Sequence, residues 1–355
     1  MKELSIPLAE PTKAESKGAR GIAALAMVML HLFCNYNPPC EILVYAGKYP
    51  LIYYFGLLGS LCVPAYCFLI GYAQFLIYEK NPKAFYKSSF KRVVNLYINY
   101  AVVVVVFAIV GLIVRNETIP GSITTFLGNV FIVGMSYNGA WWFLPVYIIL
   151  VFMSPLFVKI VNKVNPILIF LVSGFLYFVT YAIFVGLSFD IEIQNPVLSW
   201  LWKNLIHILK HQFALLLGMM FYKYKIISRI KYAMSKKKWL IPAFYVGMII
   251  VILICSIEES AILDPFRAVS ALVCFYTLPH PKFVKKFFGF LGEHSTNIWF
   301  VHMFYYIVLF KGLVFKAKYS LLVLIFMLAL CIATSYVIKF IISLINKALP
   351  KKSEA

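Results

Sequence analysis

Long apolar blocks separated by short basic loops constrain this chain more than any other feature. The chain has 355 residues, of which 63% are hydrophobic and 13% charged, and its mean hydropathy is +0.87. A water-soluble domain of this composition would lack the polar surface that keeps it in solution. Apolar stretches of about 20 residues are instead long enough to cross a lipid bilayer as helices. The sequence therefore predicts an all-α fold, a polytopic bundle of transmembrane helices.

Hydropathy predicts about ten spans. A further apolar stretch, 122–135, is short for a span and contains two glycines, so we expect a re-entrant or interfacial segment there. The ten predicted spans are 20–35, 50–78, 93–114, 141–160, 165–188, 205–223, 239–256, 261–278, 296–315 and 319–346.

Basic residues favour alternate loops. With the N-terminus in the cytoplasm, the inner segments hold 24 lysines and arginines and the outer loops hold 6. This bias predicts that both termini are cytoplasmic and that the number of spans is even. We expect a cytoplasmic segment over 1–19, a membrane domain over 20–346 and a cytoplasmic tail over 347–355. The net charge of +20 does not indicate nucleic acid, because the basic residues lie in short loops and not on a soluble basic module.

Ionisable side chains inside membrane spans are costly and mark candidate functional sites. Three more basic residues, Arg20, Lys91 and Arg92, lie at the cytoplasmic mouths of the first and third spans. The ionisable residues within the spans are His31, His207, Lys210, His211, Arg267, His302 and Lys339.

Arg20 and His31 share one face of the first span. Eleven residues bring a helix round to within about 20° of its starting direction and about 16 Å further along its axis. A ligand lying along this face would meet a cation at the cytoplasmic mouth and an imidazole deep in the bilayer. An acyl-coenzyme A fits this arrangement, with its phosphates at Arg20 and its thioester near His31.

The stretch "RGIAALAMVMLH" resembles the arginine-x10-histidine motif of the membrane-bound acyltransferase-3 family, which contains bacterial O-acyltransferases with about ten spans. The resemblance extends over nearly the whole chain. It implies transfer of an acyl group, usually acetyl, from cytoplasmic acyl-CoA to a hydroxyl of an extracytoplasmic cell-surface glycan, in the bacterial cytoplasmic membrane. Four further stretches match in order: "FLIGYAQF" with "FYKSSFKRVVNLYINY", "AWWFLPVYIILVFMSPLF", "FALLLGMMFYKYK" and "LGEHSTNIWFVHMF".

The resemblance also implies site residues. The essential histidine of the family corresponds to His31, its first-helix arginine to Arg20 and its third-helix basic motif to Arg92. Many members carry a second arginine three residues later, where this chain has Asn95, and Lys91 is the candidate to replace that phosphate contact. Trp142, Ser295 and His302 match the remaining motifs as substrate-binding residues.

Two routes of transfer remain open for His31. A neutral imidazole can take the proton of a sugar hydroxyl as that hydroxyl attacks the thioester, or it can carry the acyl group itself. The indole N–H of Trp142 or the hydroxyl of Ser295 is a candidate donor to the thioester oxyanion. Simpler roles compete: Ser295 as the N-cap of the ninth span, Trp142 in the interfacial aromatic belt, and His302 in helix packing.

Other polar residues have structural explanations. His207 and His211 are four residues apart, a spacing that can bind metal, but packing or a polar cavity lining explains them better, and we expect no metal. Arg267 follows Asp264 by three residues, which favours a local ion pair over binding of the acceptor.

A second class of function is a glycolipid transporter or flippase that performs no acyl transfer. A transporter of that kind would show paired repeats or interrupted helices in both halves, and the sequence indicates neither. The expected partners are acyl-CoA as donor substrate, with no permanently bound cofactor, a glycan or glycolipid acceptor, and membrane lipids. A homodimer or a separate extracytoplasmic partner is also compatible with the sequence.

Overall fold

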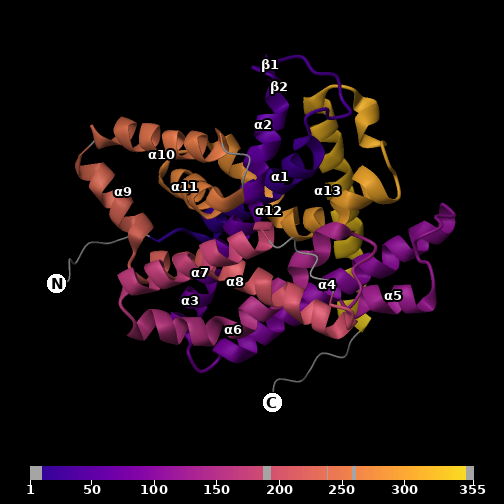
Figure 1. Ribbon diagram of the computed structural model, residues 1–355, viewed down its shortest axis with the longest axis horizontal. Coiled ribbons are helices and arrows are strands. Elements are labelled where there is room, and N and C mark those ends of the chain that lie inside the picture. The colour runs from indigo at the N-terminus through magenta and orange to yellow at the C-terminus, as the bar shows by residue number, and fades with distance from the viewer. Residues whose placement is uncertain (1–9, 187–192, 238, 258–260, 349–355) are drawn as a thin grey trace.

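The computed structural model describes residues 10–186, 193–237, 239–257 and 261–348, and its regular structure is almost entirely helical (Figure 1). One short antiparallel hairpin, β1 (Tyr45–Ala46) and β2 (Tyr49–Pro50), follows the first helix. The longer helices are α1 (Lys13–Phe33), α2 (Leu51–Leu58), α3 (Cys62–Lys80), α4 (Phe85–Ile113), α5 (Ile123–Val130), α6 (Phe143–Lys163), α7 (Pro166–Gly186), α8 (Pro196–Lys223), α9 (Ile226–Lys236), α10 (Leu240–Ile257), α11 (Asp264–Thr277), α12 (Lys282–Met303) and α13 (Ser320–Ala348). The short helical turns are η1 (Gly59–Leu61), η2 (Gly139–Trp142), η3 (Ala261–Leu263), the π-helical η4 (Phe304–Val308) and η5 (Val314–Ala317).

Within the described residues, each predicted span falls mainly on one helix or on a run of neighbouring helices, and the ninth, 296–315, is interrupted by a turn at 309–313 between η4 and η5. Six of these runs are long and apolar enough to cross a membrane. The predicted all-α membrane fold is therefore confirmed, whereas ten crossings and two cytoplasmic termini stay predictions. Among the described residues, the six runs are Leu51–Lys80, Phe85–Ile113, Gly139–Lys163, Pro166–Ile183, Val197–Lys223 and Ser320–Ala348.

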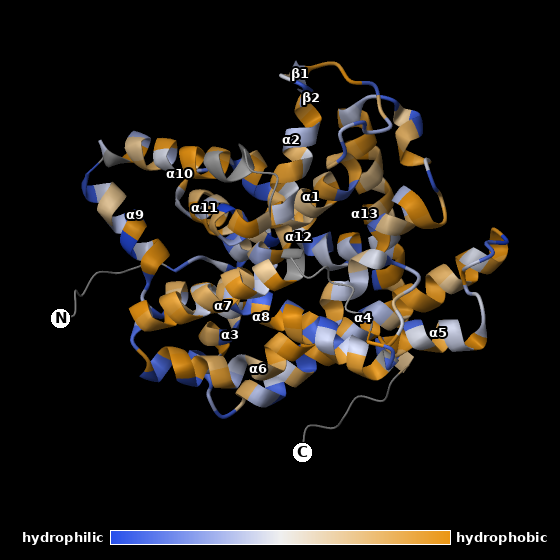
Figure 2. Cartoon of the chain, viewed as in Figure 1, coloured by the Kyte–Doolittle hydropathy of each residue, from blue (hydrophilic) through white to orange (hydrophobic). Residues whose placement is uncertain are grey.

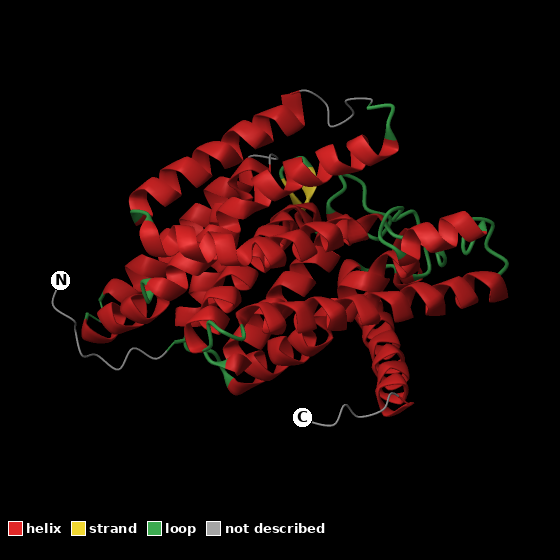
Figure 3. Ribbon diagram, turned by 90° about the horizontal axis from the view of Figure 1, so that it is seen from below, coloured by secondary structure: helices red, strands yellow, loops and turns green. Residues whose placement is uncertain are grey.

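The outer surface of the helices is apolar, as lipid contact requires. Figure 2 shows hydrophobic residues along α4, α6 and α10. On α4 the exposed side chains include Val105, Ile109 and Leu112, three and four residues apart and so on one helix face. Figure 3 shows α13, which leads to the C-terminus, extending beyond the other helices. An exposed apolar stripe of this kind fits the hydrocarbon of a bilayer.

The segment 122–135 contains only the eight-residue helix α5, which is too short to cross a membrane. Two tyrosines of α4 hold it: Tyr97 donates a hydrogen bond to the Val130 carbonyl at 3.0 Å, and Tyr100 donates to the Asn129 carbonyl at 2.6 Å. The buried Asn129 side chain in turn accepts the backbone N–H of Tyr137 at 3.1 Å. The segment is therefore fixed against α4.

Helices α1 and α12 pack unusually closely. A Cβ atom on Gly21 would lie 2.1 Å from the Phe288 carbonyl oxygen, and one on Gly292 would lie 1.8 Å from the Lys17 carbonyl oxygen. Small residues permit such backbone contact between membrane helices. Lys17 lies beside Gly292 and His31 lies beside His302, so the two helices run parallel. In a chain with ten spans the first and the ninth start on the same side of the membrane, and this parallel orientation is compatible with that arrangement.

Candidate active site

The beginning of α1 is fixed by its cap. The Thr12 hydroxyl accepts the Glu15 backbone N–H at 3.1 Å, and the Glu15 carboxylate accepts the Thr12 backbone N–H at 2.8 Å. This reciprocal pair is a capping box, which satisfies two N–H groups that a helix start leaves open. The start of the helix that carries Arg20 and His31 is therefore defined by its own sequence.

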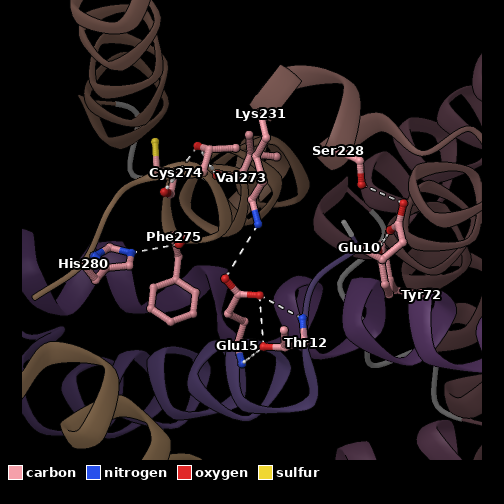
Figure 4. A network of polar contacts seen from close by, with 11 residues as sticks. Glu10, Thr12, Glu15, Tyr72, Ser228, Lys231, Val273, Cys274, Phe275 and His280 are labelled. Carbon is pink, nitrogen blue, oxygen red and sulfur yellow. Dashed lines mark hydrogen bonds and ion pairs between the residues drawn. The ribbon is translucent and has the colours of Figure 1, made fainter. Parts of the chain in front are cut away.

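Carboxylates of the N-terminal segment also tie α1 to neighbouring helices (Figure 4). Glu10 accepts hydrogen bonds from Tyr72 of α3 and from Ser228 of α9, the latter at 2.8 Å. Glu15 pairs with Lys231 of α9 at 3.7 Å. Burial alone would raise the pKa of Glu15. The hydrogen bonds with Thr12 and the nearby Lys231 ammonium together outweigh burial, so the pKa of Glu15 is lowered. These contacts hold α1 and α9 together at the end where Arg20 lies.

Tyrosine hydroxyls surround the exposed Arg20 side chain. The Arg20 charge acts on Tyr66 of α3, Tyr147 of α6 and Tyr276 of α11. Three helices other than α1 thus place a hydroxyl within electrostatic range of one guanidinium. Hydroxyl donors around a guanidinium suit an anion that carries several charged oxygen atoms, such as a phosphate.

The Arg92 side chain of α4 lies near the same tyrosine, Tyr147, as Arg20 does. Its guanidinium interacts with the Tyr147 hydroxyl, which is also in range of Arg20. The two arginines are 72 positions apart in the sequence, and the fold brings them to one tyrosine. Lys91 and Asn95, in contrast, are exposed on α4, and the described interactions join neither of them to Arg20. A role of Lys91 at this site stays a prediction.

A buried polar atom on the Arg92 face of α4 lacks a hydrogen-bond partner in the described part of the chain. It is the Oδ1 atom of Asn99, which lies seven residues after Arg92 and so on the same helix face. The Tyr66 hydroxyl lies beside the Ser295 side chain and in range of Arg20. Unpaired buried polar atoms are rare and commonly mark a ligand site.

Ser295 does not cap a helix. The prediction that it begins the ninth span is wrong, because α12 starts at Lys282 and Ser295 lies within it. Its buried hydroxyl donates a hydrogen bond to the Gly292 carbonyl at 3.0 Å. Gly292, three residues before Ser295, packs directly on α1. Ser295 nevertheless lies beside Tyr66, close to the arginine site.

His31 and His302 meet at the other end of α1. Their ring centroids are 4.8 Å apart and their planes are inclined by 38°. His31 is half-buried, whereas His302 is fully buried near the C-terminal end of α12. Two histidines that are 271 positions apart thus form a pair on two parallel helices. His31 is separated from Arg20 by about three turns of one helix.

Trp142 lies against α8. Its ring stacks on His207 at 4.3 Å and lies 5.6 Å from the ring of His211. The neighbouring Trp141 is buried and donates to the Phe300 carbonyl of α12 at 3.0 Å. These ring contacts place Trp142 against α8 and do not link it to His31, so its role as a substrate-binding residue stays a prediction.

A buried ion pair lies between α11 and the run that begins with α2. Arg267 contacts Asp264 at 3.2 Å, which confirms the predicted local pair, and both side chains are buried. Ser60 of η1 hydrogen-bonds to the Asp264 carboxylate at 2.7 Å and accepts from Arg267 at 2.9 Å. A hydroxyl that hydrogen-bonds to both partners helps to offset the free energy that a buried ion pair loses when it leaves water.

The structure brings no group of three potential metal ligands together in the ranges that it describes. His207 and His211 have parallel rings 6.0 Å apart on α8, stacked beneath Trp142. The sequence prediction of packing for these histidines agrees with that arrangement.

Sequence reasoning missed the tyrosines and Asn99. The chain contains 24 tyrosines, and a tyrosine in an apolar block looks the same whether it packs or faces a ligand. A usable signal was the seven-residue spacing of Asn99 from Arg92, which places a polar side chain below a known cation on one helix face.

No curated protein and no solved structure matches the chain. A family model described as an acyltransferase domain, that of the acyltransferase-3 family, matches residues 14–340. The matched range contains every residue described above around Arg20, Arg92, His31 and His302. The chain therefore belongs to the acyltransferase-3 family and is a membrane acyltransferase.

Proposed function

We propose that this protein transfers an acetyl group from cytoplasmic acetyl-CoA to a hydroxyl of an extracytoplasmic cell-surface glycan, in the cytoplasmic membrane of a bacterium. One observation supports the proposal above the others. Arg20 and Arg92 converge on Tyr147, while His31 of the same α1 helix pairs with His302. A cation site and an imidazole site joined by one helix match a donor with phosphates at one end and a thioester at the other.

The arginine site suits the phosphates of coenzyme A. Guanidinium groups bind phosphate through paired, charge-assisted hydrogen bonds, and the hydroxyls of Tyr66 and Tyr147 lie within reach of the same charges. Lys91 is proposed as a further phosphate contact from the exposed side of α4. Ser295, which lies beside Tyr66, is proposed to contact the donor between its phosphates and its thioester.

Chemistry is proposed to occur at His31. As base, its imidazole takes the hydroxyl proton while the acceptor oxygen attacks the thioester carbonyl, the carbon–sulfur bond breaks, and the proton passes to the departing sulfur of CoA. As acyl carrier, its ring nitrogen attacks first and the acceptor oxygen then attacks the acyl-imidazole. Both routes release CoA as a thiol and form one ester. Trp142 is proposed to line the acceptor side.

Radiolabelled acetyl-CoA tests the substrate assignment. Purified protein in vesicles would receive [14C]acetyl-CoA outside and cell-envelope saccharides of the source organism inside, with empty vesicles as the control. We expect alkali-labile label in the saccharide fraction and an equal amount of free CoA thiol. If all label stays in acetyl-CoA, or appears only as free acetate, the proposal is wrong.

A further inference from the structure

His302 is a histidine whose tautomer the fold determines. Its Nδ1 atom lies 2.9 Å from the Trp299 carbonyl oxygen and 3.1 Å from the Ile298 carbonyl oxygen. A carbonyl oxygen only accepts hydrogen bonds, so Nδ1 must carry the proton. The other ring nitrogen, Nε2, then holds a lone pair and can only accept while the ring is neutral.

That lone pair is buried and unused. His302 is 0% exposed, and its Nε2 atom has no hydrogen-bond partner among the residues that the structure describes. A buried acceptor without a donor carries the full cost of its desolvation. The ring packs against His31, with 4.8 Å between the two centroids. The neighbouring ring is therefore the group placed to supply a donor when it rotates slightly.

We propose that His302 is a positioning residue whose Nε2 accepts a hydrogen bond from a ring N–H of His31 during acyl transfer. The inference rests on the proposed function of His31. When His31 takes the hydroxyl proton at one nitrogen, its other nitrogen carries an N–H on a cationic ring. When His31 carries the acyl group, the same arrangement of charge and N–H results. In both routes a neutral acceptor with a fixed lone pair holds the ring in orientation and stabilises the cation.

This role differs from binding of the substrate. The fixed Nδ1–H of His302 is occupied by backbone carbonyls and Nε2 has no proton to give, so His302 cannot donate to a thioester oxyanion. His302 also lies on a different helix from His31, so close packing of α1 on α12 at Gly21 and Gly292 sets the separation of the rings.

His294 offers a matched comparison on the same helix. It is 1% exposed and its Nδ1 atom lies 2.8 Å from the Ser335 hydroxyl of α13. A hydroxyl can donate or accept, so the tautomer of His294 is not fixed in the same way. The ring of His294 contacts Phe290 and Tyr336. Replacement of His294 thus perturbs a buried imidazole of α12 away from the His31 ring.

Variants that keep or remove the acceptor test the inference with purified protein, acetyl-CoA and cell-envelope saccharides of the source organism. H302Q retains a side-chain oxygen near the position of Nε2, whereas H302F and H302L retain bulk without an acceptor. We expect H302F and H302L to lose kcat on the order of 10- to 100-fold, as loss of a hydrogen bond to a charged group predicts. The KM for acetyl-CoA should not change. H302Q should recover most of the lost kcat, and H294F should keep the wild-type kcat.

Several outcomes overturn the inference. They are a wild-type kcat in a folded H302F or H302L protein, a loss that H302Q does not recover, and an effect on KM alone. H294F losing as much kcat as H302F would also overturn it, because general disturbance of α12 would then explain both. Failure of the proposed function is distinguishable: in that case the wild-type protein transfers no acetyl group, and H31A does not differ from it.

Discussion

Replacing Gly292 with alanine should force helices α1 and α12 apart. The added methyl group would lie 1.8 Å from the Lys17 carbonyl oxygen, whereas ordinary van der Waals contact is 3.4–4 Å. The backbones must therefore separate by about 1.6 Å, the difference between 3.4 and 1.8 Å, since no flexible side chain can move away. Overpacking of this kind costs about 1–3 kcal/mol of unfolding free energy. It also shifts His31 from His302, and a displacement of about 1 Å can slow a reaction on the order of 100-fold.

Gly289 supplies a matched control one turn earlier on α12. Nothing lies within 4 Å of the methyl group that alanine would add there, so G289A should keep full activity and gain about 0.5–1 kcal/mol of helix stability. The assay compares both variants in one detergent, by thermal unfolding followed with tryptophan fluorescence and by the initial rate of acetyl transfer. G292A should unfold at a lower temperature and transfer more slowly. Equal unfolding temperatures and equal transfer rates of G292A and G289A would show that α1 and α12 tolerate a methyl group at position 292, contrary to this prediction.

Two further predictions concern the packing around α12. Ser335→Ala removes the hydroxyl that contacts both His294 and Asn297, at 2.8 and 2.9 Å, and should lower the unfolding free energy by about 1–3 kcal/mol with transfer retained; an unchanged melting temperature contradicts this. The Lys17 hydrogen bond lowers the pKa of the Glu293 carboxyl, so its stabilisation is present above the ordinary carboxyl pKa and is lost as pH falls through the folded value. E293Q should therefore flatten the acid side of a melting-temperature profile against pH, and an unaltered profile argues against the pair.

Hydropathy predicts most of the helices, and the helical repeat predicts that Arg20 and His31 lie on one face of the first helix. The described residues of the predicted spans are mainly helical because a chain in lipid must satisfy its backbone hydrogen bonds within the segment. Arg20 and His31 both lie on α1 (Lys13–Phe33), where a spacing of eleven residues fixes their relation. The ion pair of Asp264 and Arg267 is equally local. Relations within one helix were therefore predictable.

Relations between helices were not predictable from the residues. Nothing in the sequence near Arg92 indicates that it approaches Tyr147, or that His302 packs on His31. Both contacts depend on how helices cross, which small residues such as Gly292 decide through backbone contact. The prediction that Ser295 caps the ninth span was wrong because α12 begins at Lys282, thirteen residues before Ser295.

Donor binding and acyl transfer are proposed to depend on opposite ends of one face of α1. Calorimetric titration of coenzyme A into Arg20→Ala and His31→Ala, each paired with a measurement of acetyl transfer, tests this division of roles. Loss of charged hydrogen bonds predicts a Kd for coenzyme A that is raised on the order of 10- to 100-fold in R20A. H31A should bind coenzyme A as the wild-type protein does and transfer no acetyl group. Normal binding of coenzyme A by R20A, or normal acetyl transfer by H31A, would contradict this division of roles between the two ends of α1.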